Sequence, residues 1–164
     1  MNMIITGFQL RAAKASLNLD YNTLSNDTNV SKITLSRLVN TIKNLDEITC
    51  SVQDAHNLYN YFRDKKLIFP NQYTVAMNYP IEKRSVINNI TRFQLVVART
   101  ALRLSQRDFA KNITSITRSS FQKFEEQKDN DYFKNTKLSP TEIVVFFNKQ
   151  GVSFPGNSSV SILS

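Results

Sequence analysis

Four polar side chains in the second half of the chain are spaced so that they can project from one side of a helix. They are Arg118, Ser119, Gln122 and Lys123, and they surround the apolar Phe121, which would face inward. Residues three and four apart lie on the same side of a helix. Arginine and lysine reach the acceptors of guanine, and glutamine pairs with adenine. These residue types favour contact with base edges in the major groove of DNA.

The first half of the chain carries a similar set, made of Lys32, Ile33, Ser36 and Arg37. Here Ile33 is suited to contact the methyl group of thymine. The ordinary alternative for either set is a solvated helix face. An apolar side chain such as Ile33 on that face favours contact with a groove or with another protein.

The starts of helices supply a further kind of contact. Free backbone amides at a helix N-terminus bind phosphate, so we expect Ser105, Gln106 and Thr117 to contact the DNA backbone. Ser31 holds the corresponding place before Lys32. The complete set of candidate DNA-contacting residues is Ser31, Lys32, Ile33, Ser36, Arg37, Ser105, Gln106, Thr117, Arg118, Ser119, Gln122 and Lys123.

The residue types needed for catalysis or metal binding do not come together in this sequence. His56 is the only histidine and Cys50 the only cysteine, so a zinc site or a Cys–His nucleophile lacks its partners. Asp129 and Asp131 are typical of a loop, and three glycines are too few and too scattered for a phosphate-binding loop. We expect a protein that is not an enzyme and that uses no cofactor or metal.

The chain repeats itself at an offset of 85 residues. A run of six residues from Ile5 returns from Ile90 with one difference, and the Phe-Pro pair at Phe69 returns at Phe154. Such self-similarity predicts two copies of one small domain. The predicted boundaries are a first domain over 1–78, a connector over 79–89 and a second domain over 90–164.

Hydrophobic periodicity predicts four or so helices in each copy, followed by a short β-hairpin. In the first copy, Asp20, Ser31 and Ser51 are suited to cap helix N-termini. Asn29 tolerates the left-handed backbone that a tight turn between helices needs. In the second copy, Pro140 stands at the first position of a helix, where proline is favoured. The predicted fold class is therefore mainly α.

The net charge of +8 is unevenly distributed. Residues 1–80 hold 8 Lys and Arg against 6 Asp and Glu, a balance of +2, and residues 81–164 hold 13 against 7, a balance of +6. Positive charge attracts polyanions such as DNA, although a basic protein without this role remains an alternative. No run of about 18 apolar residues predicts a membrane span. A single cysteine fits a cytoplasmic protein.

The residues around both candidate faces carry a recognisable spacing. In the second copy the matching segments are Leu104–Ala110 and Ile116–Glu125, and in the first copy they are Leu19–Ser25, Asn29–Ser31 and Thr34–Leu38. Together they resemble the helix-turn-helix of phage-repressor-like transcriptional regulators of the xenobiotic-response-element type. The resemblance implies a tandem repeat of two lambda-repressor-like helix-turn-helix domains, each placing its second helix in the major groove. It also implies a bacterial or phage source.

Departures from the family pattern differ between the copies. The second copy has one extra residue in its turn and lacks the turn glycine, which would tilt its recognition helix. The first copy starts its pattern with Asp20, whose carboxylate repels phosphate. The acid expected near the end of the recognition helix is Glu125 in the second copy, whereas the first has Val39. We therefore expect the second copy to supply more of the DNA affinity.

These observations favour a sequence-specific regulator of transcription, such as a repressor, with double-stranded DNA as its partner. Two different recognition helices on one chain predict an imperfect repeat or an asymmetric site. The alternative is a protein-interaction module, such as an antitoxin or a regulator's partner, on a degenerate helix-turn-helix scaffold. A homodimer through the hairpins or the terminal helices is a further partner that the sequence allows.

Overall fold

The computed structural model describes residues 5–40, 50–78, 89–113, 116–134, 137–156 and 158–162. The chain forms two compact units, unit 1 over 1–78 and unit 2 over 79–164. Residues 79–88 of the predicted connector lie outside the described residues.

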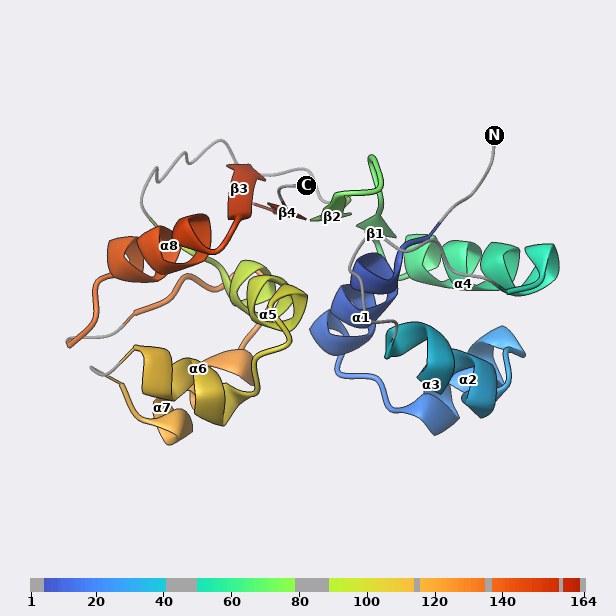
Figure 1. The fold of residues 1–164 in the computed structure, drawn as a ribbon, viewed down its shortest axis with the longest axis horizontal. Coiled ribbons are helices and arrows are strands. Elements are labelled where there is room, and N and C mark those ends of the chain that lie inside the picture. The colour runs from blue at the N-terminus through green and yellow to red at the C-terminus, as the bar shows by residue number, and fades with distance from the viewer. Residues whose placement is uncertain are drawn as a thin grey trace. The chain divides into compact units, whose positions relative to one another are not determined.

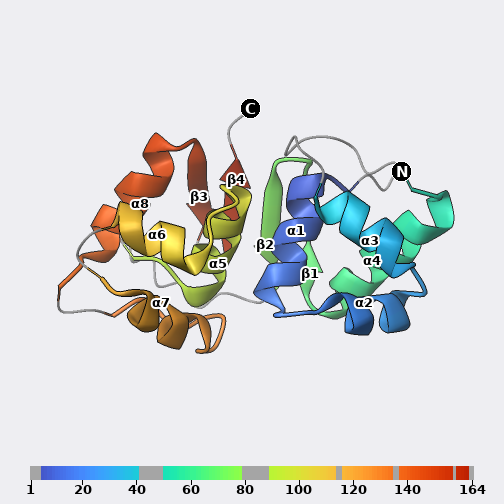
Figure 2. The ribbon, with the colours of Figure 1, turned by 60° about the horizontal axis from the view of Figure 1, so that its bottom comes forward.

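The described residues of unit 1 form four helices followed by two antiparallel strands (Figure 1). The elements are α1 (Gly7–Ser16), α2 (Tyr21–Thr28), α3 (Lys32–Val39), α4 (Val52–Asp64), β1 (Leu67–Ile68) and β2 (Thr74–Met77). Leu67 pairs with Met77 in the strand register. Helix α1 contacts β2, as Figure 2 also shows.

Unit 2 has the same order of elements. They are α5 (Arg92–Ala101), α6 (Gln106–Asn112), α7 (Arg118–Glu125), α8 (Pro140–Lys149), β3 (Val152–Gly156) and β4 (Ser159–Ile162). Val152 pairs with Ile162, and the register shifts between Ser153 and Gly156. Helix α5 contacts β4 in the way that α1 contacts β2.

The helix boundaries follow from local side-chain chemistry. The hydroxyl or carboxylate of each predicted N-cap accepts a hydrogen bond from a backbone N–H of the first turn, for example Asp20 from Thr23 at 2.8 Å. Asn29 closes α2 in the left-handed region, with φ of 57°. Pro140 occupies the first position of α8. These predicted caps and the left-handed turn are confirmed.

One glutamine in each unit explains why the Thr-x-x-Gln part of the repeated motif recurs. Gln9 and Thr6 form a capping box at the start of α1, and Gln94 and Thr91 form the same box at α5. The amide nitrogen of Gln9 also donates to the carbonyls of Asn71 at 2.6 Å and Thr74 at 3.1 Å. Each glutamine is buried, and each joins the first helix of its unit to the hairpin that closes it.

Gln94 makes the equivalent bonds in unit 2. Its amide nitrogen lies 2.7 Å from the carbonyl oxygen of Gly156 and 3.3 Å from that of Ser159. These carbonyls lie at the end of the hairpin, where Gly156 and Ser159 are register partners of β3 and β4. The glutamine therefore fixes the hairpin against the helix in both units.

The fold class differs from the mainly α, tandem lambda-repressor-like arrangement that the sequence predicted. That prediction is wrong, because the described residues are 55% helical and 13% strand, with eight helices and four antiparallel strands among them, which is a mixed α/β fold. The physical reason is that the strands belong to the core. Val75 and Val160 are fully buried, and Ala76, Met77 and Val152 are nearly so.

Candidate nucleic-acid interface

The pair α6 and α7 is held together by aromatic side chains that face inward. Phe109 and Phe121 are fully buried, with ring centroids 4.7 Å apart, and Phe109 also stacks on Phe147 of α8 at 5.1 Å. Ile116 is buried at the turn. Because these residues occupy the inner side of α7, the polar residues between them face solvent.

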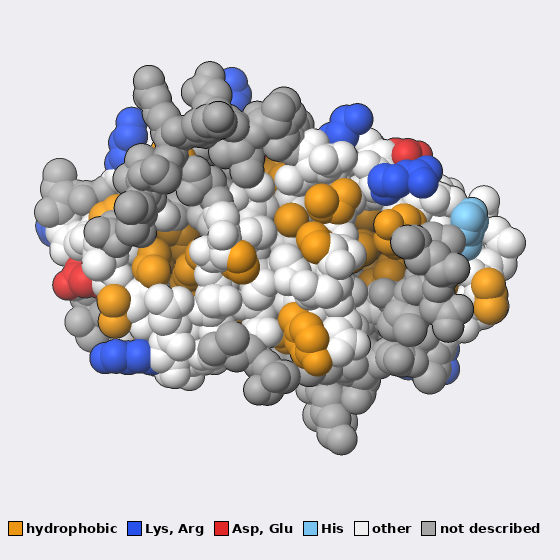
Figure 3. Space-filling model, turned by 90° about the horizontal axis from the view of Figure 1, so that it is seen from above, with side chains coloured by type: hydrophobic (Ala, Val, Ile, Leu, Met, Phe, Trp, Pro, Cys, Tyr) orange, Lys and Arg blue, Asp and Glu red, His pale blue; other side chains and the backbone are white. Residues whose placement is uncertain are grey.

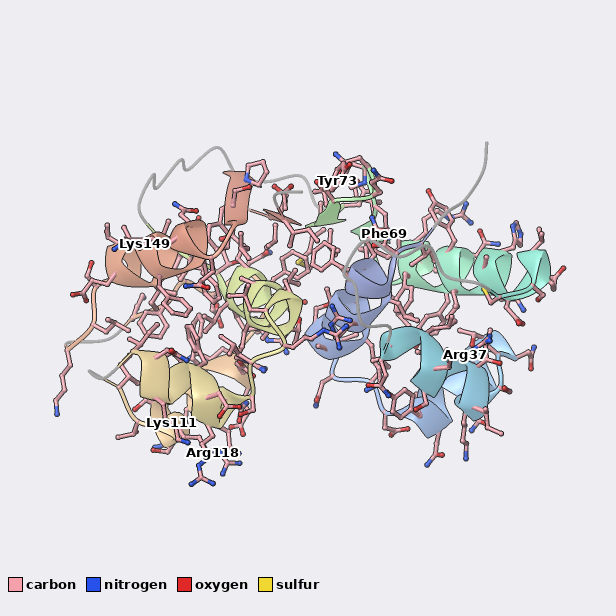
Figure 4. The ribbon with its side chains drawn as sticks, in the orientation of Figure 1. Arg37, Phe69, Tyr73, Lys111, Arg118 and Lys149 are labelled. Atoms are coloured by element: carbon pink, nitrogen blue, oxygen red, sulfur yellow. The ribbon has the colours of Figure 1, made fainter. Side chains whose placement is uncertain are left out.

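The outer face of α7 carries the four predicted residues Arg118, Ser119, Gln122 and Lys123, and all four are exposed. Figure 4 shows Arg118 on the side of α7 that points away from α5. Within the described ranges, neither Arg118 nor Lys123 takes part in an ion pair. The face therefore offers two cations at its ends and two uncharged side chains between them.

The outer face of α3 has the same layout in unit 1. Lys32 and Arg37 are exposed at its ends (Arg37 is labelled in Figure 4), and Ser36 is half-buried. Ile33 is 83% exposed, which is a large apolar surface to leave in water. The inner side is formed by Leu35 and other buried residues.

The predicted phosphate contacts at helix starts are engaged within the protein. Ser31 and Thr117 cap α3 and α7 and remain exposed. The hydroxyl of Ser105 donates to the Asp108 carboxylate at 2.6 Å, and the amide of Gln106 donates to Glu125 at 2.7 Å. The Ser105 side chain therefore organises the start of α6, and the Gln106 side chain joins α6 to α7.

Both second helices begin next to an ionised carboxylate. The hydrogen bond from Ser105 holds the pKa of Asp108 below its ordinary value, and the backbone N–H of Thr23 does the same for the pKa of Asp20. The sequence indicated this repulsion toward phosphate for unit 1 alone. Because unit 2 has Asp108 in the corresponding turn, the two units are more alike here than the first residue of each pattern suggests.

A buried polar network beneath α7 was not predicted from the sequence. Glu125 is bound by two of the three guanidinium nitrogens of Arg99, at 2.7 and 2.8 Å, and by Gln106. The side chains of Arg99 and Glu125 are only 12% and 9% exposed. The acid at position 125 was the one signal in the sequence, since its partners lie 26 and 19 residues away along the chain.

The last turn of each third helix also receives an arginine from the first helix. The Arg92 side chain donates to the carbonyl of Glu125 at 2.9 Å, and the Arg11 side chain donates to the carbonyl of Val39 at 3.1 Å. A cation at a helix C-terminus is favoured by the helix dipole. These arginine bonds connect the end of each third helix to the first helix of its unit, and in unit 2 the Glu125 network adds to that connection.

The histidine and cysteine do not form a catalytic or metal-binding site with other described residues. His56 is exposed (pale blue in Figure 3). Burial, with the charge of Asp54, raises the pKa of the Cys50 thiol. Among the described residues, no group of three or more His, Cys, Asp or Glu could hold a metal ion. In the same ranges, no helix has the length and apolar character to cross a membrane.

No protein-family model, no curated protein and no solved structure matches the chain. The chemistry of the two outer faces therefore carries the functional conclusion.

Proposed function

We propose that this protein is a cytoplasmic, non-enzymatic regulator of transcription that binds double-stranded DNA through the outer faces of α3 and α7. One observation carries the proposal. The same four positions on each third helix are exposed or half-exposed, and in each unit they run cation, uncharged, uncharged, cation. In unit 1 these are Lys32, Ile33, Ser36 and Arg37, and in unit 2 they are Arg118, Ser119, Gln122 and Lys123.

This order of charges suits a helix that lies in the major groove. The cations at the two ends reach the phosphate strands that border the groove, and they supply affinity by releasing counterions. The uncharged pair lies one helical turn apart, between the cations, where it meets base edges. The net charge of +8 adds long-range attraction to DNA.

Two such faces on one chain raise affinity without a second subunit. Once the first face binds, the second binds as an intramolecular event with a raised effective concentration. The uncharged pairs differ between units, so the bound site has two unlike halves. The chemistry of each pair, Ile33 with Ser36 and Ser119 with Gln122, determines the sequence of its own half.

The direct test measures DNA affinity as a function of salt for the variant Arg118→Gln/Lys123→Gln. Losing two phosphate contacts lowers the slope of log affinity against log salt by about 2. The matched control is Lys134→Gln/Lys149→Gln, which removes the same charge from exposed sites in unit 2 outside the proposed face. Equal slopes for the two variants would contradict the proposal.

A second candidate function is a protein-interaction module, and the exposed Ile33 favours it. An isoleucine that is 83% exposed gains about 2 kcal/mol if a partner surface buries it. The partner is a second copy of the chain, which binds through this face, the hairpins or the terminal helices. If Ile33→Ser abolishes dimerisation in sedimentation velocity but leaves DNA affinity unchanged, this second function is the better one.

A further inference from the structure

The side chain of the residue that follows each third helix forms a hydrogen bond with an uncharged side chain on the outer face of that helix. In unit 1 the Asn40 amide nitrogen donates to the Ser36 hydroxyl oxygen at 3.3 Å. In unit 2 the Gln122 amide nitrogen donates to a Glu126 carboxylate oxygen at the same distance, 3.3 Å. Asn40 and Glu126 occupy the C-cap position of α3 and α7. The proposed function does not use either of them.

In unit 1 this bond favours donation by the serine. Asn40 occupies one of the two lone pairs of the Ser36 oxygen, and because the amide nitrogen is a donor, the O–H points away from it and stays available to donate. Serine and threonine hydroxyls in helices often donate to a carbonyl one turn back, as that of Thr28 does to Leu24 at 2.6 Å. In the described part of the chain, the hydroxyl of Ser36 has no such acceptor. It therefore presents a donor toward solvent.

The neighbour of this donor on the same face is apolar. Ile33 precedes Ser36 by three residues, which places the two side by side on the helix. Thymine presents an acceptor, O4, next to a methyl group in the major groove. A donor beside an isoleucine matches that pair of groups. No other base edge offers both an acceptor and a methyl group.

In unit 2 the corresponding bond orients an amide. One N–H of Gln122 is held by Glu126, which fixes the direction of the amide plane and leaves its oxygen and second N–H toward solvent. Adenine presents a donor at N6 and an acceptor at N7, which an outward amide satisfies in a bidentate pair. An amide without such a partner would sample both orientations, and half of them would be mispaired.

We propose that Asn40 and Glu126 are positioning residues that set the hydrogen-bonding direction of Ser36 and Gln122. As a result both halves of the DNA site contain an A·T pair, which unit 1 reads from thymine and unit 2 reads from adenine. This inference rests on the proposed DNA binding. It adds the base preference and assigns a role to two residues that touch no DNA.

The test is selection of bound duplexes from a random pool by the full-length chain and its variants. The wild type enriches an A·T pair in each half. Glu126→Ala lowers the preference for adenine in one half by about five- to tenfold, because an oriented bidentate pair is lost. Glu126→Gln keeps an acceptor for Gln122 and retains the preference. A structural role alone would not separate these two variants.

A uniform change in affinity has a different meaning from a change in base preference. Both Glu126 variants remove a negative charge near DNA, so both bind all sequences more tightly. If that uniform gain is the only effect, Glu126 acts through its charge and the inference is overturned. Circular dichroism melting of each variant verifies that the chain remains folded.

The second variant reverses the hydrogen bond in unit 1. In Asn40→Asp the Ser36 hydroxyl donates to the new carboxylate, so its oxygen faces the groove as an acceptor. The preference then moves from thymine to a base with a donor, adenine N6 or cytosine N4. Asn40→Ala, the control, weakens the preference without moving it. An unchanged thymine preference in Asn40→Asp overturns the inference.

The outcomes separate this inference from the proposed function. If the wild type enriches a two-part site and the variants enrich the same site unchanged, DNA binding stands and the positioning roles are wrong. If the wild type enriches no sequence, the proposed function fails, and the inference that rests on it fails with it.

Discussion

The two units stabilise the end of the third helix in different ways. In unit 2 a buried ion pair of Arg99 with Glu125, joined by Gln106, connects α5, α6 and α7. The corresponding positions in unit 1 are Lys14, Val39 and Tyr21. There the ammonium group of Lys14 lies over the ring of Tyr21, 4.6 Å from its centroid, and Val39 packs as an apolar residue.

All three of these positions differ between the two units, and the chemistry of each residue fits that of its neighbours. A buried carboxylate is tolerated only when its oxygens are paired, so Glu125 requires both Arg99 and Gln106. Once that position is a valine, an arginine would be left without its partner. Unit 1 then has a lysine and an aromatic ring, whose attraction does not need a buried anion.

A second pair of residues shows the same principle with a shift along the helix. Arg92 is the first residue of α5, whereas Arg11 lies one turn later than the corresponding position in α1. Each nevertheless donates to the last carbonyls of the third helix in its own unit. The units therefore keep the contact to the helix end while they change the residue that makes it.

The largest expected effect comes from giving unit 2 the valine of unit 1. Glu125→Val leaves Arg99 buried without its partner, and unfolding of unit 2 becomes easier by about 3 kcal/mol. Arg99→Met/Glu125→Val restores stability to within about 1 kcal/mol, since no unpaired charge remains. Amide hydrogen exchange of the full-length chain, measured for peptides of each unit, gives both values. If the double variant is no more stable than the single one, the ion pair is not the cause.

The next largest effect concerns the glutamine that binds the hairpin in both units. Gln9→Ala and Gln94→Ala each remove donors from two hairpin carbonyls, and each costs its own unit about 2 kcal/mol. Exchange of the amides in β1 and β2, or in β3 and β4, rises accordingly. The two losses should be similar. A loss in one unit only would mean that the second glutamine bond is dispensable.

A smaller effect is expected from Lys14→Met in unit 1. Burial lowers the pKa of Lys14, so burying its ammonium group has a cost, which the charge of Asp20 and the contact with Tyr21 offset. The net change is therefore below about 1 kcal/mol. Denaturant unfolding measures it. A loss as large as that of Glu125→Val would remove the distinction between the two units.

The smallest effect concerns a contact between α4 and α2. The hydroxyl of Tyr61 donates to Asp27 at 3.0 Å, whereas the corresponding residue of unit 2 is Phe146, which packs on Phe109. Burial and the Asp27 carboxylate raise the pKa of Tyr61 to about 12. Stability from this bond is present below the ordinary tyrosine pKa and is lost as pH rises toward 12.

Tyr61 is half-buried, but its bond to Asp27 lies at the protein surface, so the bond contributes less than about 1 kcal/mol. An ultraviolet titration of phenolate absorbance detects it directly. In the wild type the last tyrosine ionises near pH 12, and in Tyr61→Phe that step is missing. If Tyr61→Phe instead loses a step near the ordinary tyrosine pKa, Tyr61 is not held by Asp27.

Local chemistry made several features of each unit predictable. The caps at Asp20 and Ser31, the left-handed Asn29 and the proline at the start of α8 were all read from neighbouring residues. They could be, because a cap bonds within three residues and a turn depends on one backbone angle. The exposed residues of α3 and α7 were predictable for the same reason, since helical spacing alone separates inner from outer positions.

The fold class was not predictable in this way, because the pattern of each hairpin does not show whether its strands belong to the core. Whether Val75 and Val160 are core residues depends on which helix packs against the strand, and α1 and α5 are more than fifty residues away in sequence.

The sequence by itself determined the repeat, the helix starts and the composition of the two outer faces. Only the tertiary structure decided that Gln9 and Gln94 bind the hairpins and that Arg99 neutralises Glu125. It also decided that the strands complete each core. Contacts within one helical turn are determined by spacing along the chain. Contacts between distant segments form only when the chain folds, and no local sequence pattern specifies which distant residues come into contact.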